Sequence, residues 1–129
     1  MKQEDKDLLL KDLCSRLPYG VKCQIDIGDA DVYVDTLTNI TIDGFVSFME
    51  TIDTEDVLGY GNIKPLLFPM SSMTEEQKEE HKDLLDNQYS FDANGNIFTL
   101  QDFYCKHHID YRGLIPKGLA NDVTGLNIY

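Results

Sequence analysis

Hydrophobic residues recur along this chain with two different periods, and the change between them marks the first elements. Over about residues 3–17, apolar side chains return every three or four positions, which is the spacing of one helix face, and Pro18 with Gly20 ends the helix. From Val21 the period becomes two. Apolar and polar residues alternate through VKCQIDI and DVYVDT, as they do in half-buried strands joined by a turn.

The run ITIDGFVSFM, which follows Thr38 and Asn39, predicts a third strand and leaves room for a fourth. Adjacent strands with short connections are typical of an antiparallel meander. The segment from Phe45 to Ile52 also satisfies helical spacing, so strand and helix both stay open there. Gly44 and the β-branched residues around it favour a strand.

The alternation divides the side chains of the predicted sheet between two faces. One face is expected to line the core with Val21, Cys23, Ile25, Val32, Val34, Ile40 and Ile42. The other face is then polar and mostly acidic, with Asp26, Asp31, Asp35 and Asp43 among its residues.

A proline-interrupted segment comes next, in the run IKPLLFPMSSM. Because proline lacks a backbone N–H, Pro65 and Pro69 argue against a central strand and for an extended piece packed across the core. Thr74 and Gln77 then form a capping box that opens a helix ending near Asn87.

Turn and capping residues also divide the last third of the chain. Asn94 and Gly95, between two short β-prone runs, predict a hairpin. Thr99 caps a final helix over LQDFYCKHH, and the rest, rich in glycine and proline, is expected to be a packed C-terminal tail. The 129 residues thus predict a single α+β domain: an N-terminal helix, an antiparallel sheet of three to five strands that could curl as in SH3 domains, and two later helices.

The net charge of −12 disfavours direct binding to nucleic acid or to an anionic membrane. Most of the imbalance lies between Val21 and Ile63, where nine acids accompany one lysine.

Neither a signal peptide nor an apolar stretch long enough to span a bilayer is evident in the sequence. Cys14, Cys23 and Cys105 are widely spaced, which favours reduced, buried thiols and a cytoplasmic protein.

The densest group of reactive side chains is Cys105, His107, His108, Asp110, Tyr111 and Arg112. Such residues can bind a metal or provide a nucleophile and a base. However, two helical metal ligands want i, i+4 spacing, whereas His107 and His108 are adjacent and point about 100° apart. A helix C-terminus explains them better, and Tyr111 with Arg112 would make a recognition spot if exposed. We therefore expect no metal site and no cofactor.

Three stretches carry a family resemblance: KDLCSRLPYGVK, NIKPLLFPMSSMTEEQK and HHIDYRGLIPKGLA, together with the ending TGLNIY. They resemble a family of small uncharacterised proteins from gut anaerobic bacteria and their phages or mobile elements. The resemblance spans nearly the whole chain. It implies an intracellular bacterial origin and one compact domain, and it brings no activity, ligand or functional residue.

Two classes of function remain. The first is a small non-catalytic binding or regulatory protein, acting on a protein partner or on a second copy of itself. A sharper form of it is an acidic decoy that mimics the nucleic-acid backbone with the carboxylates between Asp26 and Asp56. The alternative class is a small hydrolase or metal-dependent enzyme that uses His107 or His108 with Asp110.

Overall fold

The computed structural model describes residues 2–26, 32–41, 46–49 and 63–129 of the chain. The fold is α+β, as the hydrophobic pattern predicts. Its helices are α1 (Gln3–Arg16), α2 (Glu75–Asn87) and α3 (Leu100–Lys106), with short 3-10 turns η1 (Leu17–Tyr19) and η3 (Met70–Ser72). Its strands are β1 (Lys22–Asp26), β2 (Val32–Ile40), β3 (Val46–Phe48), β4 (Ile63–Pro69), β5 (Tyr89–Phe91), β6 (Ile97–Thr99), β7 (Ile109–Asp110) and β8 (Asn121–Asp122).

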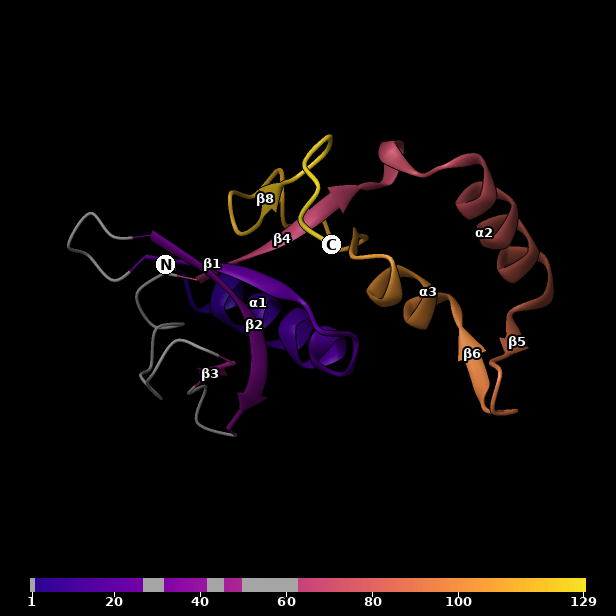
Figure 1. The fold of residues 1–129 in the computed structure, drawn as a ribbon, viewed down its shortest axis with the longest axis horizontal. Helices are drawn as coiled ribbons and strands as arrows, with labels where there is room; N and C mark the ends of the chain where they lie inside the picture. The colour runs from indigo at the N-terminus through magenta and orange to yellow at the C-terminus, as the bar shows by residue number, and fades with distance from the viewer. Residues whose placement is uncertain (1, 27–31, 42–45, 50–62) are drawn as a thin grey trace.

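Two hydrophobic clusters hold these elements. In the larger cluster, Leu9 and Leu13 of α1 pack against Val21, Cys23 and Ile25 at the inner face of the sheet. The smaller cluster joins α2 to α3 through Leu84, Phe103, Tyr104 and Ile109. Figure 1 shows the consequence, with α1 against β1 and β2 at one end, and α2, α3 and the β5–β6 hairpin at the other.

The main sheet has the order β3-β2-β1-β4-β7, and β8 also pairs with β4. Strands β1, β2 and β3 form the antiparallel meander that the alternation predicts. Strand β4 is antiparallel to β1, but it pairs in parallel with β7 and β8. The sheet is therefore mixed, because β7 and β8, which follow α3, run in the same direction as β4.

The predicted faces are wrong for the first part of β2, whereas Ile40 packs against the core as expected. Ile42 lies outside the described residues. Asp35 pairs with Cys23 and lies buried on the core face, whereas Val32 and Val34 are 52% and 55% exposed. Leu37, 2% exposed, takes the core position two residues after Asp35. Residues two positions apart in a strand share a face, so the burial of Leu37 also places Asp35 on the core side.

Ile40, the first residue of the predicted third strand, belongs to β2 instead. Strand β2 runs through Thr38 and Asn39 to Ile40, and the register shifts between Leu37 and Asn39 where it pairs with β3. A bulge of this kind absorbs one residue without ending the strand. Strand β3 agrees with the strand prediction for its own three residues. Phe45 and residues 50–52 of the ambiguous segment lie outside the described residues.

Strand β4 corrects the expectation drawn from its prolines. It lies inside the sheet, with β1 paired to residues 63–65 and the two parallel strands paired to residues 66–69. Pro65 is the last residue of the β1 pairing, and Pro69 is the last residue of the strand. Each proline thus stands where a run of pairing ends, so the missing N–H groups interrupt little.

Local signals in the second half of the chain are confirmed. Capping boxes at Thr74 and Thr99 open α2 and α3, and β5 pairs antiparallel with β6 around Asn94 and Gly95. Burial is less regular. Cys23 and Cys105 are buried as expected, but Cys14 is exposed.

The cap of α3 provides a test of this local encoding. The Thr99 hydroxyl accepts a 3.3 Å hydrogen bond from the Asp102 N–H and donates a 2.9 Å bond to the Asp102 carboxylate. Thr99→Ala should lower the free energy of unfolding by about 1 kcal/mol, measured by urea denaturation. Thr99→Ser keeps the hydroxyl and should stay within a few tenths of wild type. Equal midpoints for the two variants would contradict the cap.

Candidate functional site

The segment after α3 holds the reactive residues singled out in the sequence. His107 ends α3, and His108 follows in the left-handed conformation with φ 57°. This backbone turn directs the chain into β7, where Ile109 and Asp110 run beside Phe68 and Pro69 of β4. Because the backbone turns here, the side chains of the two histidines point towards different neighbours.

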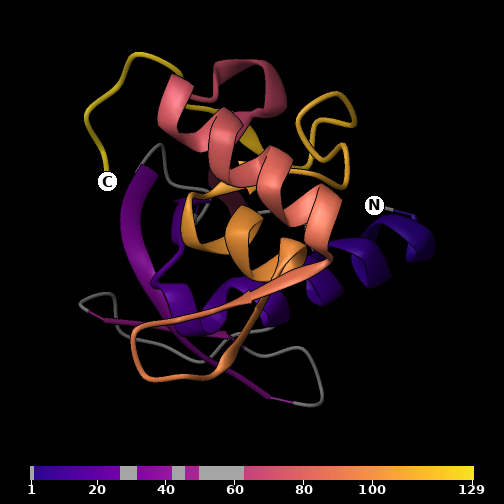
Figure 2. The ribbon, with the colours of Figure 1, turned by 90° about the vertical axis from the view of Figure 1, so that its right-hand side faces the viewer.

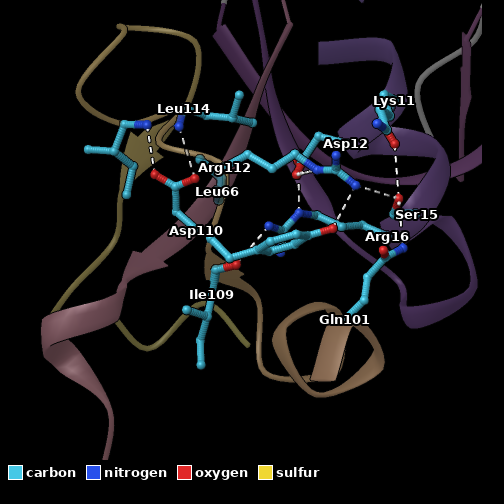
Figure 3. A network of polar contacts seen from close by, with 12 residues as sticks. Lys11, Asp12, Ser15, Arg16, Leu66, Gln101, Ile109, Asp110, Arg112 and Leu114 are labelled. Atoms are coloured by element: carbon cyan, nitrogen blue, oxygen red, sulfur yellow. Dashed lines mark hydrogen bonds and ion pairs between the residues drawn. The ribbon is translucent and has the colours of Figure 1, made fainter. Parts of the chain in front are cut away.

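Asp110 is buried, and its carboxylate accepts hydrogen bonds from the backbone. Its two carboxylate oxygens accept 2.9 Å hydrogen bonds from the N–H groups of Leu114 and Ile115 (Figure 3). These bonds fix the turn that follows β7. A carboxylate occupied by two backbone donors at this turn is a structural cap and a poor base for the adjacent histidines.

Arg112 belongs to a buried ion cluster. Its Nε lies 3.2 Å from Asp12 Oδ1, and Arg16 donates from Nε to Asp12 Oδ2 at 2.8 Å. Asp12 and Arg16 are fully buried, and the Arg112 side chain is 12% exposed. Arg16 also donates to the Ile109 carbonyl at 2.7 Å, which ties α1 to β7 (Figure 3). We call Asp12, Arg16 and Arg112 the arginine cluster.

Tyr111 packs inside this cluster. Its ring stacks on Tyr104 with centroids 4.8 Å apart, and the guanidinium carbons of Arg16 and Arg112 lie 5.4 and 4.8 Å from its centroid. Its hydroxyl accepts a 2.7 Å hydrogen bond from Arg112. Tyr111 and Arg112 therefore connect α1 with the C-terminal half, and both are only partly exposed. A recognition role for them stays a prediction.

The two histidines serve different neighbours. His107 Nδ1 lies 3.3 Å from Gln77 Nε2, and its Nε2 lies 3.5 Å from Glu80 Oε2, so the ring faces α2. His108 instead stacks on Tyr129, with centroids 3.5 Å apart. Burial, helped by the charges of nearby cationic groups, lowers the pKa of His108 to about 4. The ring is thus neutral at neutral pH.

This arrangement does not bring a catalytic set together. The hollow beside His107, lined by Phe68, Ser72, Thr74, Gln77, His107 and Ile109, has a volume of about 140 Å³. Substrate pockets are usually at least twice that size. Among the described residues, no group of three or more His, Cys, Asp or Glu side chains is placed to hold a metal ion. In the same part of the chain, no helix is long and apolar enough to cross a membrane.

The predicted acidic face is divided. Asp26 is exposed at the end of β1, while Asp35 is buried on the core side of β2. Asp31 and Asp43 lie outside the described residues. On the outer side of β1, Lys22 and Gln24 contact the C-terminal tail through hydrogen bonds.

A surface that the sequence reasoning missed lies on the β5–β6 hairpin. Tyr89, Phe91 and Ile97 share its outer face, because Phe91 pairs with Ile97 and Tyr89 lies two residues from Phe91. They are 50%, 63% and 63% exposed. Phe98, on the other side of the hairpin, packs against the α2–α3 cluster. We call Tyr89, Phe91 and Ile97 the hairpin face; its signal was the alternation in YSF and IFT around Asn-Gly.

The hairpin face belongs to an acidic stretch of the chain. Residues 75–99, which form α2 and the hairpin, contain seven acids and two lysines. Figure 2 shows α2 and the hairpin together at this end of the molecule. This end of the molecule thus combines an exposed apolar surface with a segment of net negative charge.

No protein-family model, curated protein or solved structure matches this chain. The resemblance to small proteins of gut anaerobic bacteria therefore stays a prediction. The candidate site has to be interpreted from its own geometry.

Removing the single negative charge of the arginine cluster should strongly lower the free energy of unfolding. Asp12→Asn leaves two guanidinium groups in the interior without a counter-ion, and it should lower the free energy of unfolding by about 3 kcal/mol. Asp7→Asn, at an exposed position of the same helix, should change it by less than about 0.5 kcal/mol. Urea denaturation measures both. A loss below about 1 kcal/mol for Asp12→Asn would show that the cluster does not depend on the carboxylate.

His108 predicts a loss of stability in acid. The charges that oppose its protonation come from Arg16 of α1, His107 of α3 and Lys22 of β1. Because the pKa falls from 6.5 in the unfolded chain to about 4 in the folded chain, the unfolded state binds more protons between these values. The contribution of the neutral His108 ring to the free energy of unfolding is therefore complete above pH 6.5 and is lost as the pH falls towards 4.

The matched variant is His108→Asn, since asparagine tolerates the left-handed backbone. Between neutral pH and the acid end of that window, its urea midpoint should fall less than that of wild type. Parallel decreases in the two proteins would assign the acid sensitivity to other groups.

Proposed function

We propose that this chain is a small non-catalytic protein-binding domain, and that the hairpin face is the surface that contacts its partner. The observation that carries this proposal is the joint exposure of Tyr89, Phe91 and Ile97 on one side of a two-stranded hairpin. Exposed apolar patches of this kind mark interaction sites, and aromatic residues are enriched at the centres of interfaces.

The hairpin itself favours a covered state. An isolated two-stranded hairpin is only marginally stable in water, and this one is supported on one side alone, through Phe98. The T-shaped contact of Tyr89 with Phe91, with centroids 5.7 Å apart, presents two rings together. Rings held in this way lose little conformational entropy when a partner covers them.

Charge complementarity indicates the chemistry of the partner. With seven acids against two lysines over residues 75–99, this part of the chain attracts a surface that is apolar at its centre and basic around it. Two copies meeting through this face would bring like charges together, which disfavours self-association. We therefore infer a different protein with a basic, apolar surface as the partner.

The other functions considered from the sequence receive less support. The hydrolase hypothesis needs the histidines to converge with Asp110, and the three side chains have separate structural partners. The decoy hypothesis needs a regular acidic face, and Asp35 is buried on the core side. Within the described residues, neither hypothesis has an observation that favours it as the exposed hairpin favours protein binding.

The test is a selection from a random peptide library displayed on phage, with the full-length chain as bait. Selected peptides should combine apolar residues with lysine or arginine, and added salt should weaken their binding. The double variant Phe91→Ser, Ile97→Ser should bind them at least tenfold more weakly in fluorescence polarisation. Because both positions are exposed, its thermal midpoint should stay close to that of wild type.

Two controls accompany the selection. Val32→Ser with Val34→Ser removes equally exposed apolar side chains from β2 and should leave binding unchanged. His107→Gln should also bind normally. Peptides without positive charge, or equal binding by the hairpin double variant, would contradict the proposal. A dimer in sedimentation that the hairpin variant abolishes would indicate a second copy as the partner instead.

A further inference from the structure

A second binding feature is formed where the C-terminal tail meets the main sheet. The Tyr129 hydroxyl accepts a 2.8 Å hydrogen bond from the Lys22 N–H and lies 2.9 Å from the Leu66 carbonyl oxygen, to which it donates. In the β1–β4 register Cys23 pairs with Pro65, so Lys22 and Leu66 are the next pair. The hydroxyl therefore occupies the end of the strand ladder and satisfies one donor and one acceptor there.

The ring of Tyr129, like its hydroxyl, has specific neighbours. His108 stacks on it almost in parallel, with an interplanar angle of 11°, and Phe68 lies tilted with its centroid 6.2 Å away. The Lys22 ammonium lies 5.7 Å from the ring centroid. We call Lys22, Leu66, Phe68 and His108 the tyrosine slot.

The slot contains a costly backbone conformation. His108 has φ 57°, which is unfavourable for a residue with a side chain, although histidine is found there more often than most. This conformation turns the imidazole towards Tyr129. Strained residues concentrate at sites that bind something, and here the bound group is a phenol ring.

The tail that carries the ring is otherwise weakly held. Residues 124–127 are all exposed, and Thr124 and Leu126 hydrogen-bond to Asp122 and Val123 of the same turn. The Ile128 carbonyl accepts one hydrogen bond from Lys22 Nζ. Tyr129 itself keeps 38% of its surface exposed. The ring is therefore joined to the core through a short exposed segment, as a tethered ligand is.

We propose that the tyrosine slot is a peptide-binding site for an extended segment that carries a tyrosine, filled here by the chain's own Tyr129 and able to take the tail of a second copy in its place. The tail sequence is the one segment known to fit the slot, which is why a second copy is the inferred source. A tethered ring competes at a local concentration of roughly millimolar. Exchange between copies thus becomes appreciable at similar protein concentrations, or when the resident ring is removed.

The experiment opens the slot with Tyr129→Ala in the full-length chain and adds a fluorescent synthetic peptide, Thr-Gly-Leu-Asn-Ile-Tyr. Binding should be saturable, and wild type should bind at least tenfold more weakly because its own ring competes. A peptide ending in phenylalanine should bind about tenfold more weakly to the opened slot, since it lacks the hydroxyl. No saturation at several millimolar, or equal binding of both peptides, would overturn the site.

Two further measurements complete the test. If Tyr129→Ala does not fold, the tyrosine peptide should restore its folded spectrum and the phenylalanine peptide should do so poorly; failure of rescue would also overturn the site. For the second copy, unlabelled wild type at about millimolar concentration should shift the Lys22 and Leu66 amide signals of labelled Tyr129→Ala as the peptide does. Unlabelled Tyr129→Ala is the matched control. A peptide that binds while wild type causes no shift would reject exchange between copies.

Discussion

A carboxylate shared by two guanidinium groups joins the two ends of this fold. Asp12 contacts Arg16 on its own helix and Arg112 beyond β7, and Arg16 also reaches the Ile109 carbonyl. Burying such charges costs desolvation energy, so the cluster stabilises the fold only while each member keeps its partners. With them in place, α1 fixes the path of β7. That path determines where His108 and Asp110 point.

The arginine cluster also explains which residues are left for binding. Tyr111 and Arg112 have the side chains of interface anchors, but the fold uses them to connect α1 with the C-terminal half. The hairpin face has no such internal partner, because Phe98 supplies the inward contact and leaves Tyr89 and Phe91 outside. Recognition chemistry therefore has to be judged from burial, and residue type alone is a poor guide to it.

This difference separates what the sequence could predict from what it could not. The helices, their threonine caps and the Asn-Gly hairpin are encoded by neighbouring residues, and each was predictable. Which residues of β2 face the core was decided by the burial of Leu37. The position of β4 in the sheet was decided by its pairing with strands that follow α3. The Arg16 bond to Ile109 joins residues 93 positions apart, and no local pattern signals it. The hairpin face was within reach of the alternation, but exposure could not be read from it.

Two tyrosines show how connectivity sets the role of a similar contact. Tyr111 and Tyr129 each stack on a neighbouring ring and lie near a cation. Tyr111 lies between β7 and a turn that Asp110 caps, so its ring cannot leave without breaking both. Ile128 and Tyr129 follow four exposed residues, which bond only within their own turn among the hydrogen bonds of the described residues. In our proposal, the same chemistry is thus permanent in one place and exchangeable in the other, because the backbone that leads to the ring differs.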